Sequence, residues 1–114
     1  MNNNDKEKIY LIGELADLAG ISIRTLHHYD HVDLLKPSRR DENGYRQYGF
    51  KDLLVLQQIL FFKELDFPLK QIKRILHNPQ TDFLALLHQH KQSLEHRIKR
   101  LKTLLATLDK TIQN

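Results

Sequence analysis

The segment that decides the fold is ISIRTLHHYD, residues 21–30 of the 114-residue chain. Ser22 can cap a helix by accepting hydrogen bonds from the free backbone amides of the first turn. Ile23 and Leu26 lie three residues apart and therefore share one face of that helix. A second short, mostly apolar helix lies just upstream and ends at Gly20. Two short helices joined by a tight glycine turn predict a helix-turn-helix.

The other face of this helix is polar and supplies candidate contacts to a nucleic acid. It carries a guanidinium, hydroxyl groups and an imidazole, which can hydrogen-bond to phosphates and base edges. We expect the capping serine and this face to contact DNA through Ser22, Arg24, Thr25, His28 and Tyr29. Plain helix surface is the alternative for the arginine, and core packing of the ring is the alternative for the tyrosine.

Composition excludes several other classes of protein. The chain has no cysteine, which rules out disulfides, thiolate metal sites and iron–sulfur clusters. Its 18 Lys and Arg against 14 Asp and Glu give a net charge of +4, which permits a polyanionic partner without requiring one. No apolar run approaches the ~18 residues of a membrane span, and no secretory signal is found. We therefore expect a cytoplasmic protein that does not engage a membrane.

Short elements are expected on either side of the helix-turn-helix. Residues 1–8 are polar and are expected to form a flexible tail. The first helix is expected over about residues 13–19 and the second over about residues 23–31. The segment before Pro37 is expected to be extended, because a residue that precedes proline avoids helical backbone angles.

A basic hairpin is predicted over residues 38–48. Asn43-Gly44 is a strong signal for a hairpin turn, and the flanking residues alternate as in strands. Basic and tyrosine side chains on its arms indicate a wing that contacts DNA. The candidate contacts are Arg39, Arg40, Tyr45 and Arg46. A hairpin whose charges are merely solvated is the alternative.

Two more helices are predicted after the hairpin, over about residues 50–65 and 68–77. Asp66-Phe67-Pro68 separates them, and Pro68 suits the first helical position of the later helix. Lys63 lies near the end of the earlier helix and is a candidate phosphate contact in a second wing. Ordinary helix surface is the alternative for this lysine.

A long last helix is predicted from Thr81-Asp82 to about Ile112. Apolar residues recur on it at alternating steps of three and four, and only Lys91 interrupts the stripe, a pattern typical of a coiled coil. At ~1.5 Å per residue the helix is roughly 45 Å long, which is more than a small domain can cover. We therefore expect a homodimer whose contacts include Leu87, Leu94, Ile98, Leu101, Leu105, Leu108 and Ile112.

In this order and spacing, the motifs resemble the N-terminal DNA-binding domain of the MerR family of bacterial transcription regulators. The resemblance runs from about Tyr10 to the end and is nearest to the multidrug-responsive branch, whose members carry a separate C-terminal effector domain. It is carried by IGELA at residues 12–16, SIRTL at 22–26, HYD at 28–30, LLKPSRR at 34–40 and NGYRQY at 43–48.

The resemblance implies a mainly α fold of the winged helix-turn-helix type, with a small β-hairpin wing and a second wing from the following helix pair. Residues 9–79 would form this DNA-binding domain. Residues 80–114 would form a long C-terminal helix that makes an antiparallel coiled-coil dimer. Such dimers bind pseudo-palindromic promoters with an overlong spacer. They bend and untwist the DNA so that RNA polymerase engages both promoter elements, which activates transcription.

The chain departs from the family pattern in several places. His27 and His28 stand where many relatives have arginine or tyrosine, which lowers the local positive charge. Asp33 stands where glycine is common, and Gly49 replaces a serine or threonine cap. The largest departure is that no effector domain follows the coiled coil. We therefore expect a truncated regulator, or one without its own sensor. It should bind no small molecule, since it leaves no enclosed apolar volume of ~300 Å³.

Other functions fit the sequence less well. No catalytic constellation or phosphate-cradling glycine loop is found, so we do not expect an enzyme. His27 and His31 have a spacing of four that can bind a metal, but no carboxylate or thiolate completes the set at a familiar spacing. We therefore expect no metal and no cofactor. The alternative function is a coiled-coil adaptor that binds another protein and leaves the basic hairpin solvated.

Overall fold

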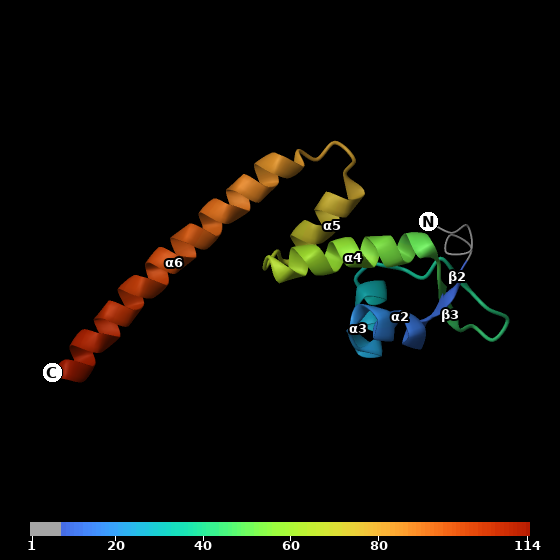
Figure 1. Ribbon diagram of the computed structural model, residues 1–114, viewed down its shortest axis with the longest axis horizontal. Coiled ribbons are helices and arrows are strands. Elements are labelled where there is room, and N and C mark those ends of the chain that lie inside the picture. Colours follow the sequence, from blue (N-terminus) through green and yellow to red (C-terminus); the bar gives the residue numbers. More distant parts are fainter. Residues whose placement is uncertain (1–7) are drawn as a thin grey trace. The chain divides into compact units, whose positions relative to one another are not determined.

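The computed structural model describes residues 8–114, and these residues belong to two compact units, residues 1–78 and 79–114. The expected tail therefore falls outside the described residues, except for Lys8. The first unit contains small strands and four helices, and the second contains a single long helix (Figure 1). In chain order the elements are β1 (Tyr10–Leu11), α2 (Ile12–Ala19), α3 (Ile23–His31), β2 (Arg39–Arg40), β3 (Arg46–Tyr48), α4 (Phe50–Glu64), α5 (Leu69–His77) and α6 (Phe83–Gln113).

The predicted helix-turn-helix is confirmed as α2 and α3. Gly20 ends α2 in the left-handed conformation at φ 70°, and the next amide, of Ile21, donates to the carbonyl of Ala16 at 3.0 Å. Only glycine adopts this conformation without a steric cost from Cβ. Ser22 caps α3, because its Oγ accepts from the backbone amide of Thr25 at 3.0 Å. The glycine turn and the serine cap therefore fix where one helix ends and the next begins.

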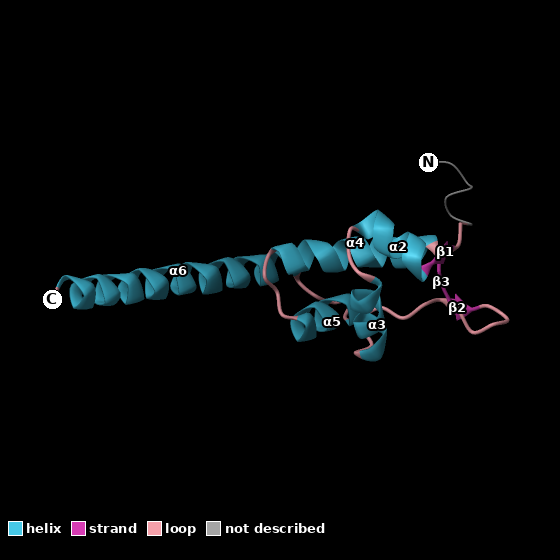
Figure 2. Cartoon of the chain, turned by 90° about the horizontal axis from the view of Figure 1, so that it is seen from below, coloured by secondary structure: helices cyan, strands magenta, loops and turns pink. Residues whose placement is uncertain are grey.

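The hairpin predicted from Asn43-Gly44 is also present, and we call residues 39–48 the wing. Its turn depends on Asp41, whose carboxylate accepts from the amides of Asn43 and Tyr45 at 2.9 Å each. Gly44 takes a left-handed φ of 83°. The sheet has a third strand, because β1 pairs antiparallel with β3 on the side away from β2 (Figure 2). A strand of two residues is too short to show an alternating pattern, so the sequence predicted two strands only.

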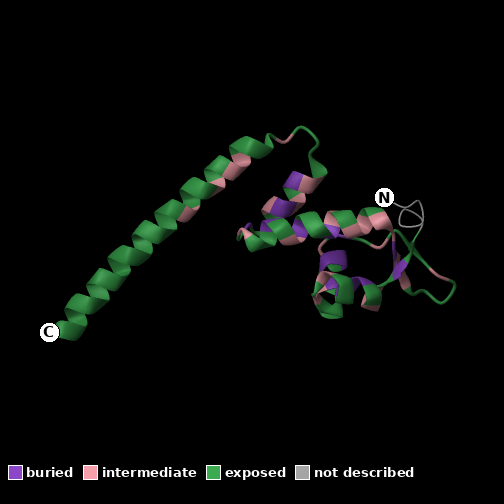
Figure 3. Cartoon of the chain, viewed as in Figure 1, coloured by how far each residue is buried: buried purple, intermediate pink, exposed green. Residues whose placement is uncertain are grey.

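The core of the first unit lies where α2, α3 and the sheet meet α4 and α5 (Figure 3). From α4 it receives Leu56, Ile59 and Phe62, each at most 2% exposed. Leu54 on the same helix remains 44% exposed. The largest fully buried side chains are Tyr48, Phe62, Phe67, Leu15, Leu26, Leu56, Ile59 and Ile72.

The connections between these helices differ slightly from expectation. Pro68 is the N-cap of α5 and not its first helical residue, which is Leu69. Gly49 caps α4 as expected, and its own backbone amide donates to the carboxylate of Asp52 at 2.7 Å, so the first turn of α4 holds the cap residue although glycine has no side chain that could accept. Asp33 adopts a left-handed φ of 60°. This is the conformation expected where relatives carry glycine, and aspartate tolerates it better than most residues.

The second unit is dominated by α6, a helix of 31 residues. At a rise of ~1.5 Å per residue, its length is about 46 Å. Asp82 caps it by accepting from the amide of Ala85 at 3.1 Å. No residue of α6 is buried, and the apolar side chains at positions 98, 101, 105, 108 and 112 are between 52% and 77% exposed. Within residues 8–114, no helix is both long and apolar enough to cross a lipid bilayer.

Candidate nucleic-acid interface

The outer face of α3 is open to solvent and polar. Leu26, Tyr29 and Asp30 face inward, whereas Arg24 and His28 are exposed as predicted. His27 and His31 are also exposed, so three histidines and one arginine share this face. Such a helix, with hydrogen-bonding groups on its outer face and an inner face packed against the domain, can be presented to a nucleic-acid groove.

Three other residues predicted on this face have additional roles. Tyr29 is 4% exposed, so its ring belongs to the core, and burial raises the pKa of its hydroxyl. The Oγ atoms of Ser22 and Thr25 lie 2.9 Å apart and share a hydrogen bond. The two hydroxyls therefore support the start of α3, and any nucleic-acid contact by them would be shared with this structural role.

The arginines of the wing do not all project freely. Arg46 is only 28% exposed in its side chain, and its Nε donates to Asp30 Oδ2 at 2.9 Å. Arg40 places Nη2 at 3.8 Å from the same oxygen and donates through Nη1 to the carbonyl of Gly44 at 3.0 Å. Arg39 and Tyr45 are exposed, the tyrosine at 65%. The wing thus combines arginines that are held by the fold with groups that face solvent.

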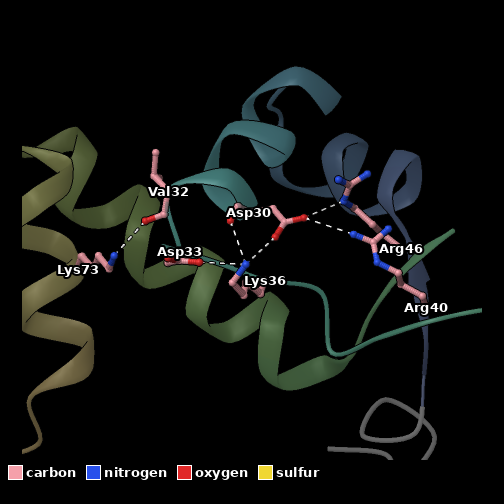
Figure 4. A network of polar contacts seen from close by, with 7 residues as sticks. All are labelled: Asp30, Val32, Asp33, Lys36, Arg40, Arg46 and Lys73. Atoms are coloured by element: carbon pink, nitrogen blue, oxygen red, sulfur yellow. Dashed lines mark hydrogen bonds and ion pairs between the residues drawn. The ribbon is translucent and has the colours of Figure 1, made fainter. Parts of the chain in front are cut away.

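Asp30 is the centre of a cluster that sequence reasoning missed, and we call Asp30, Lys36, Arg40 and Arg46 the Asp30 cluster. Figure 4 shows Lys36 approaching one carboxylate oxygen and the two arginines approaching the other. The hydrogen bond from Arg46, followed by that from Lys36, lowers the pKa of Asp30 although burial opposes the shift. The cluster therefore ties the wing to α3 through one buried carboxylate.

A signal for this cluster was present in the sequence. Residues 26, 29 and 30 are spaced three and four apart, so the helical period places Asp30 on the inward face beside Leu26. A buried carboxylate needs charged or hydrogen-bonding partners, and basic residues follow it within sixteen positions. The period and the charge together could have identified Asp30 as a structural anchor.

Basic groups also line α5, whereas only Lys63, on α4, was predicted from the sequence as a contact of the second wing. Lys63 is exposed on the last turn of α4. Lys70, Lys73, Arg74 and His77 lie three and four residues apart and line a hollow of about 300 Å³. Lys73 also donates to the carbonyl of Val32 at the end of α3, at 3.1 Å (Figure 4). Basic side chains thus hold α3 from two sides, Lys73 from α5 and the two arginines of the Asp30 cluster from the wing.

Hollows on the described surface bear on the expectation that the chain encloses no apolar volume of ligand size, which stays a prediction. A half-open apolar hollow of about 650 Å³ lies between the start of α2, the start of α3 and the turn of the wing. Leu11, Ile23 and Tyr45 line it and are all exposed. The space arises because the wing projects from the sheet beside the two short helices. Within residues 8–114, His, Asp and Glu side chains do not gather in threes that could hold a metal ion.

Two family models match this chain. One is described as MerR HTH family regulatory protein and matches residues 10–78, and the other as MerR, DNA binding, and matches residues 53–111. The HTH-type transcriptional activator mta of Bacillus subtilis (strain 168) is 45% identical over 103 residues, which are 90% of this chain and 40% of that protein. The HTH-type transcriptional activator TipA of Streptomyces coelicolor is 41% identical over 104 residues, 91% of this chain and 41% of that protein. The chain thus spans about 40% of the length of these curated relatives.

Solved structures are similar to this chain both in fold and in sequence. The crystal structure of MtaN, the N-terminus of the Bacillus subtilis multidrug transporter activator, superposes with a TM-score of 0.88 at 44% identity and covers 92% of this chain and 99% of that one. HiNmlR, a MerR family regulator that lacks the sensor domain and was solved bound to promoter DNA, superposes with a TM-score of 0.62 at 31% identity. That match covers 92% of this chain and 88% of HiNmlR.

Proposed function

The chain belongs to the MerR family of helix-turn-helix regulatory proteins, and we propose on this premise that it is a dimeric, sequence-specific regulator that binds promoter DNA. Members of this family are DNA-binding regulators and not enzymes. The observation that carries the proposal is the exposed polar face of α3, held beside a basic wing by the Asp30 cluster. A rigid, donor-rich helix beside a basic hairpin fits a groove and the phosphates that flank it.

Within this proposal the residues divide by their position. The exposed face of α3 enters the major groove, where Arg24 and His28 reach base edges. The hydroxyls of Ser22, Thr25 and Tyr29 contact the phosphates at the groove edge. The wing and the last turn of α4 contact the backbone through Arg39, Arg40, Tyr45, Arg46 and Lys63.

The dimer is formed by α6. The apolar seam is the stripe Leu87, Leu94, Ile98, Leu101, Leu105, Leu108 and Ile112. Its members from position 98 onward are more than half exposed in the single chain. Covering each such side chain contributes about 1.5–3 kcal/mol, so a second copy packed antiparallel along this seam supplies a large driving force. Two copies then present two α3 helices to the two halves of a pseudo-palindrome.

The dimer distorts the promoter that it binds. We propose that the spacer between the two polymerase-binding elements is overlong and that the bound dimer bends and untwists it, so that RNA polymerase engages both elements and transcription is activated. Smoothly bending a site of this size costs about 1–6 kcal/mol, which backbone contacts from both wings can offset. Two relatives are named transcriptional activators, which supports activation over repression.

The test compares promoters that differ only in symmetry or in spacer length. The protein should bind a pseudo-palindromic promoter with an overlong spacer far more tightly than the same DNA with one half-site scrambled, and affinity should fall steeply with salt as counterions are released. Transcription in vitro should rise on the overlong spacer and not on one of ordinary length. Equal binding to both DNAs would exclude the regulator and favour the coiled-coil adaptor, which needs no DNA.

Arg24→Ala is the matched variant, with Lys99→Ala on α6 as its control. The regulator loses about 1–3 kcal/mol of DNA affinity with the first change and little with the second. Transcription should not respond to lipophilic cations, since the apolar hollow beside the wing is half-open and does not enclose a ligand. A drug-dependent increase from this chain would contradict that part of the proposal.

A further inference from the structure

A second hollow lies between α3 and the wing and is polar. It has a volume of about 530 Å³ and is lined by His27, Asp30, His31, Lys36 and Arg46. We call it the histidine hollow. It adjoins the exposed face of α3, because His27 and His31 belong to both. The sugar-phosphate backbone of a nucleic acid that lies along this face therefore passes over the opening of the hollow.

The fixed charges around the histidine hollow nearly cancel. Lys36, Arg40 and Arg46 are cationic, and they face the carboxylates of Asp30 and Asp33. The pKa of Asp30 is lowered by its hydrogen bonds to Arg46 and Lys36, so this carboxylate is ionised throughout the neutral range. The pKa of Asp33 is lowered by its hydrogen bond to Lys36. Without the imidazoles, the hollow therefore offers only a small net attraction for an anion.

The imidazoles decide how positive the hollow becomes. Histidine changes charge between about pH 5 and 8, whereas the lysine, arginines and paired aspartates around the hollow do not. His27 also lines the apolar hollow, together with Glu14 and Asp41. On the other side, Lys73 of α5 is close enough to Asp33 to interact with its carboxylate. With both imidazoles protonated, two more positive charges stand at the opening where an anion would enter.

We propose that the histidine hollow seats a backbone phosphate of bound DNA, and that His27 and His31 take up protons when the phosphate enters. The inference rests on the proposed DNA binding and adds a ligand class, a phosphodiester, and a proton uptake that the function alone does not require. An anion beside an imidazole favours its charged form. Binding therefore favours protonation, and protonation favours binding.

The direction of the pH dependence follows from this linkage. The histidines hold protons more tightly in the complex than in the free protein, so their contribution to affinity is fully present at low pH. It is lost as pH rises through the range in which the bound histidines release their protons. A tenfold change in proton affinity corresponds to about tenfold in DNA affinity, so two histidines give up to about a hundredfold between about pH 8 and pH 5.5.

The first experiment measures DNA affinity against pH at constant ionic strength, together with calorimetry in buffers of different ionisation enthalpy. We expect affinity to rise as pH falls and calorimetry to count up to about one proton taken up per protomer, because a tenfold change in proton affinity changes the protonation of each histidine by about half at most. Affinity that does not change with pH, with no proton uptake, would overturn the inference and leave the proposed DNA binding intact. Absence of any promoter preference at every pH would instead overturn the proposed function itself.

Variants separate a charge at the hollow from a structural role of the histidines. In the double variant His27→Gln with His31→Gln, DNA affinity should no longer depend on pH. It should stay at the low value that the wild-type protein has at high pH. His27→Arg with His31→Lys should flatten the pH profile at the high affinity, because those charges are permanent. His96→Gln on α6 is the control and should leave the profile unchanged. A glutamine pair and a cationic pair with equal affinities would contradict the inference.

A final arm identifies the source of the phosphate. Inorganic phosphate is titrated into the free protein while the imidazole signals are followed by NMR, and the same is done with the promoter duplex. We expect the signals of His27 and His31 to shift with duplex at stoichiometric amounts and with inorganic phosphate only in large excess. Saturation by inorganic phosphate that the duplex does not displace would show a seat for a free anion and overturn the assignment to DNA.

Discussion

The two units of the chain treat their apolar residues in opposite ways. In residues 8–78, leucine, isoleucine and aromatic side chains from four helices and from the strands β1 and β3 cover one another, and several are fully buried. In α6 no residue is buried, although leucine and isoleucine recur along it. The first unit can be stabilised by contacts within the chain, whereas the seam of the second needs another surface to cover it. Substitutions that act on one unit and spare the other test this difference.

The largest effect is expected from charge in the apolar seam. Leu101→Asp combined with Leu105→Asp should leave the protein monomeric, because a carboxylate is strongly disfavoured on a surface that must become dry. DNA affinity should fall by at least about a hundredfold, since the second half-site no longer binds as an intramolecular event. Sedimentation and DNA titration measure the two effects.

The control for the seam is Lys99→Asp, a charge change on the same helix away from the seam, which should leave a dimer. Circular dichroism should show that the first unit remains folded in the seam variant. A seam variant that still sediments as a dimer would mean that the chains associate through another surface.

The next effect is a cavity in the core of the first unit. Ile59→Ala should lower the free energy of unfolding of that unit by about 2–5 kcal/mol, because Ile59 is fully buried. Leu54→Ala on the same helix is the matched control and should cost far less, since Leu54 is 44% exposed. Chemical denaturation followed by circular dichroism compares the two. Equal losses would place both side chains in one well-packed core and contradict the observed burial.

A smaller effect is expected from Asp30. The pKa of this carboxylate is lowered in the folded protein, so its contribution to stability is present above the ordinary aspartate range and is lost as pH falls through the folded pKa. Asp30→Asn should lower the free energy of unfolding by about 1–3 kcal/mol at neutral pH and remove part of the loss of stability in acid. Denaturation from about pH 3 to pH 7 measures both.

Asp33→Asn is the control for Asp30, since Asp33 also pairs with Lys36 but is exposed. It should leave stability at neutral pH nearly unchanged. A larger loss from Asp33 than from Asp30 would show that Lys36, and not the buried carboxylate, holds the cluster together.

The smallest effect is expected at the cap of α3. Ser22→Ala removes the acceptor for the amide of Thr25 and should cost about 1 kcal/mol. Hydrogen exchange should show faster opening of the first turn of α3, with no change in α6. Ser22→Asp is the matched variant that restores an acceptor, and protection should return with it. Unchanged exchange in the alanine variant would mean that packing alone fixes the start of this helix.

The helices could be predicted from sequence because caps and apolar periods are local signals. Ser22 and Gly20 placed the two helices of the helix-turn-helix, and the repeats of α6 indicated its length. The strand β1 was missed because two residues have no period. Arg46 was predicted as a DNA contact of the wing without a partner in the chain. In the structure it is paired with Asp30, which lies sixteen positions earlier in another element, so the folded protein was needed to identify this partner. Whether the predicted residues contact DNA remains a prediction.

The pairing of β1 with β3 makes the beginning of the described chain a reporter of the wing. Tyr10 lies opposite Tyr48, so β1 is paired with the base of the wing, and we expect a movement of the wing to be felt at β1. Lys8 is exposed, with its ammonium 5.4 Å from the ring of Tyr10. The chain has no cysteine, so a single cysteine at position 8 could carry one spectroscopic label. Such a label would follow the wing as DNA arrives without altering any residue on the wing itself.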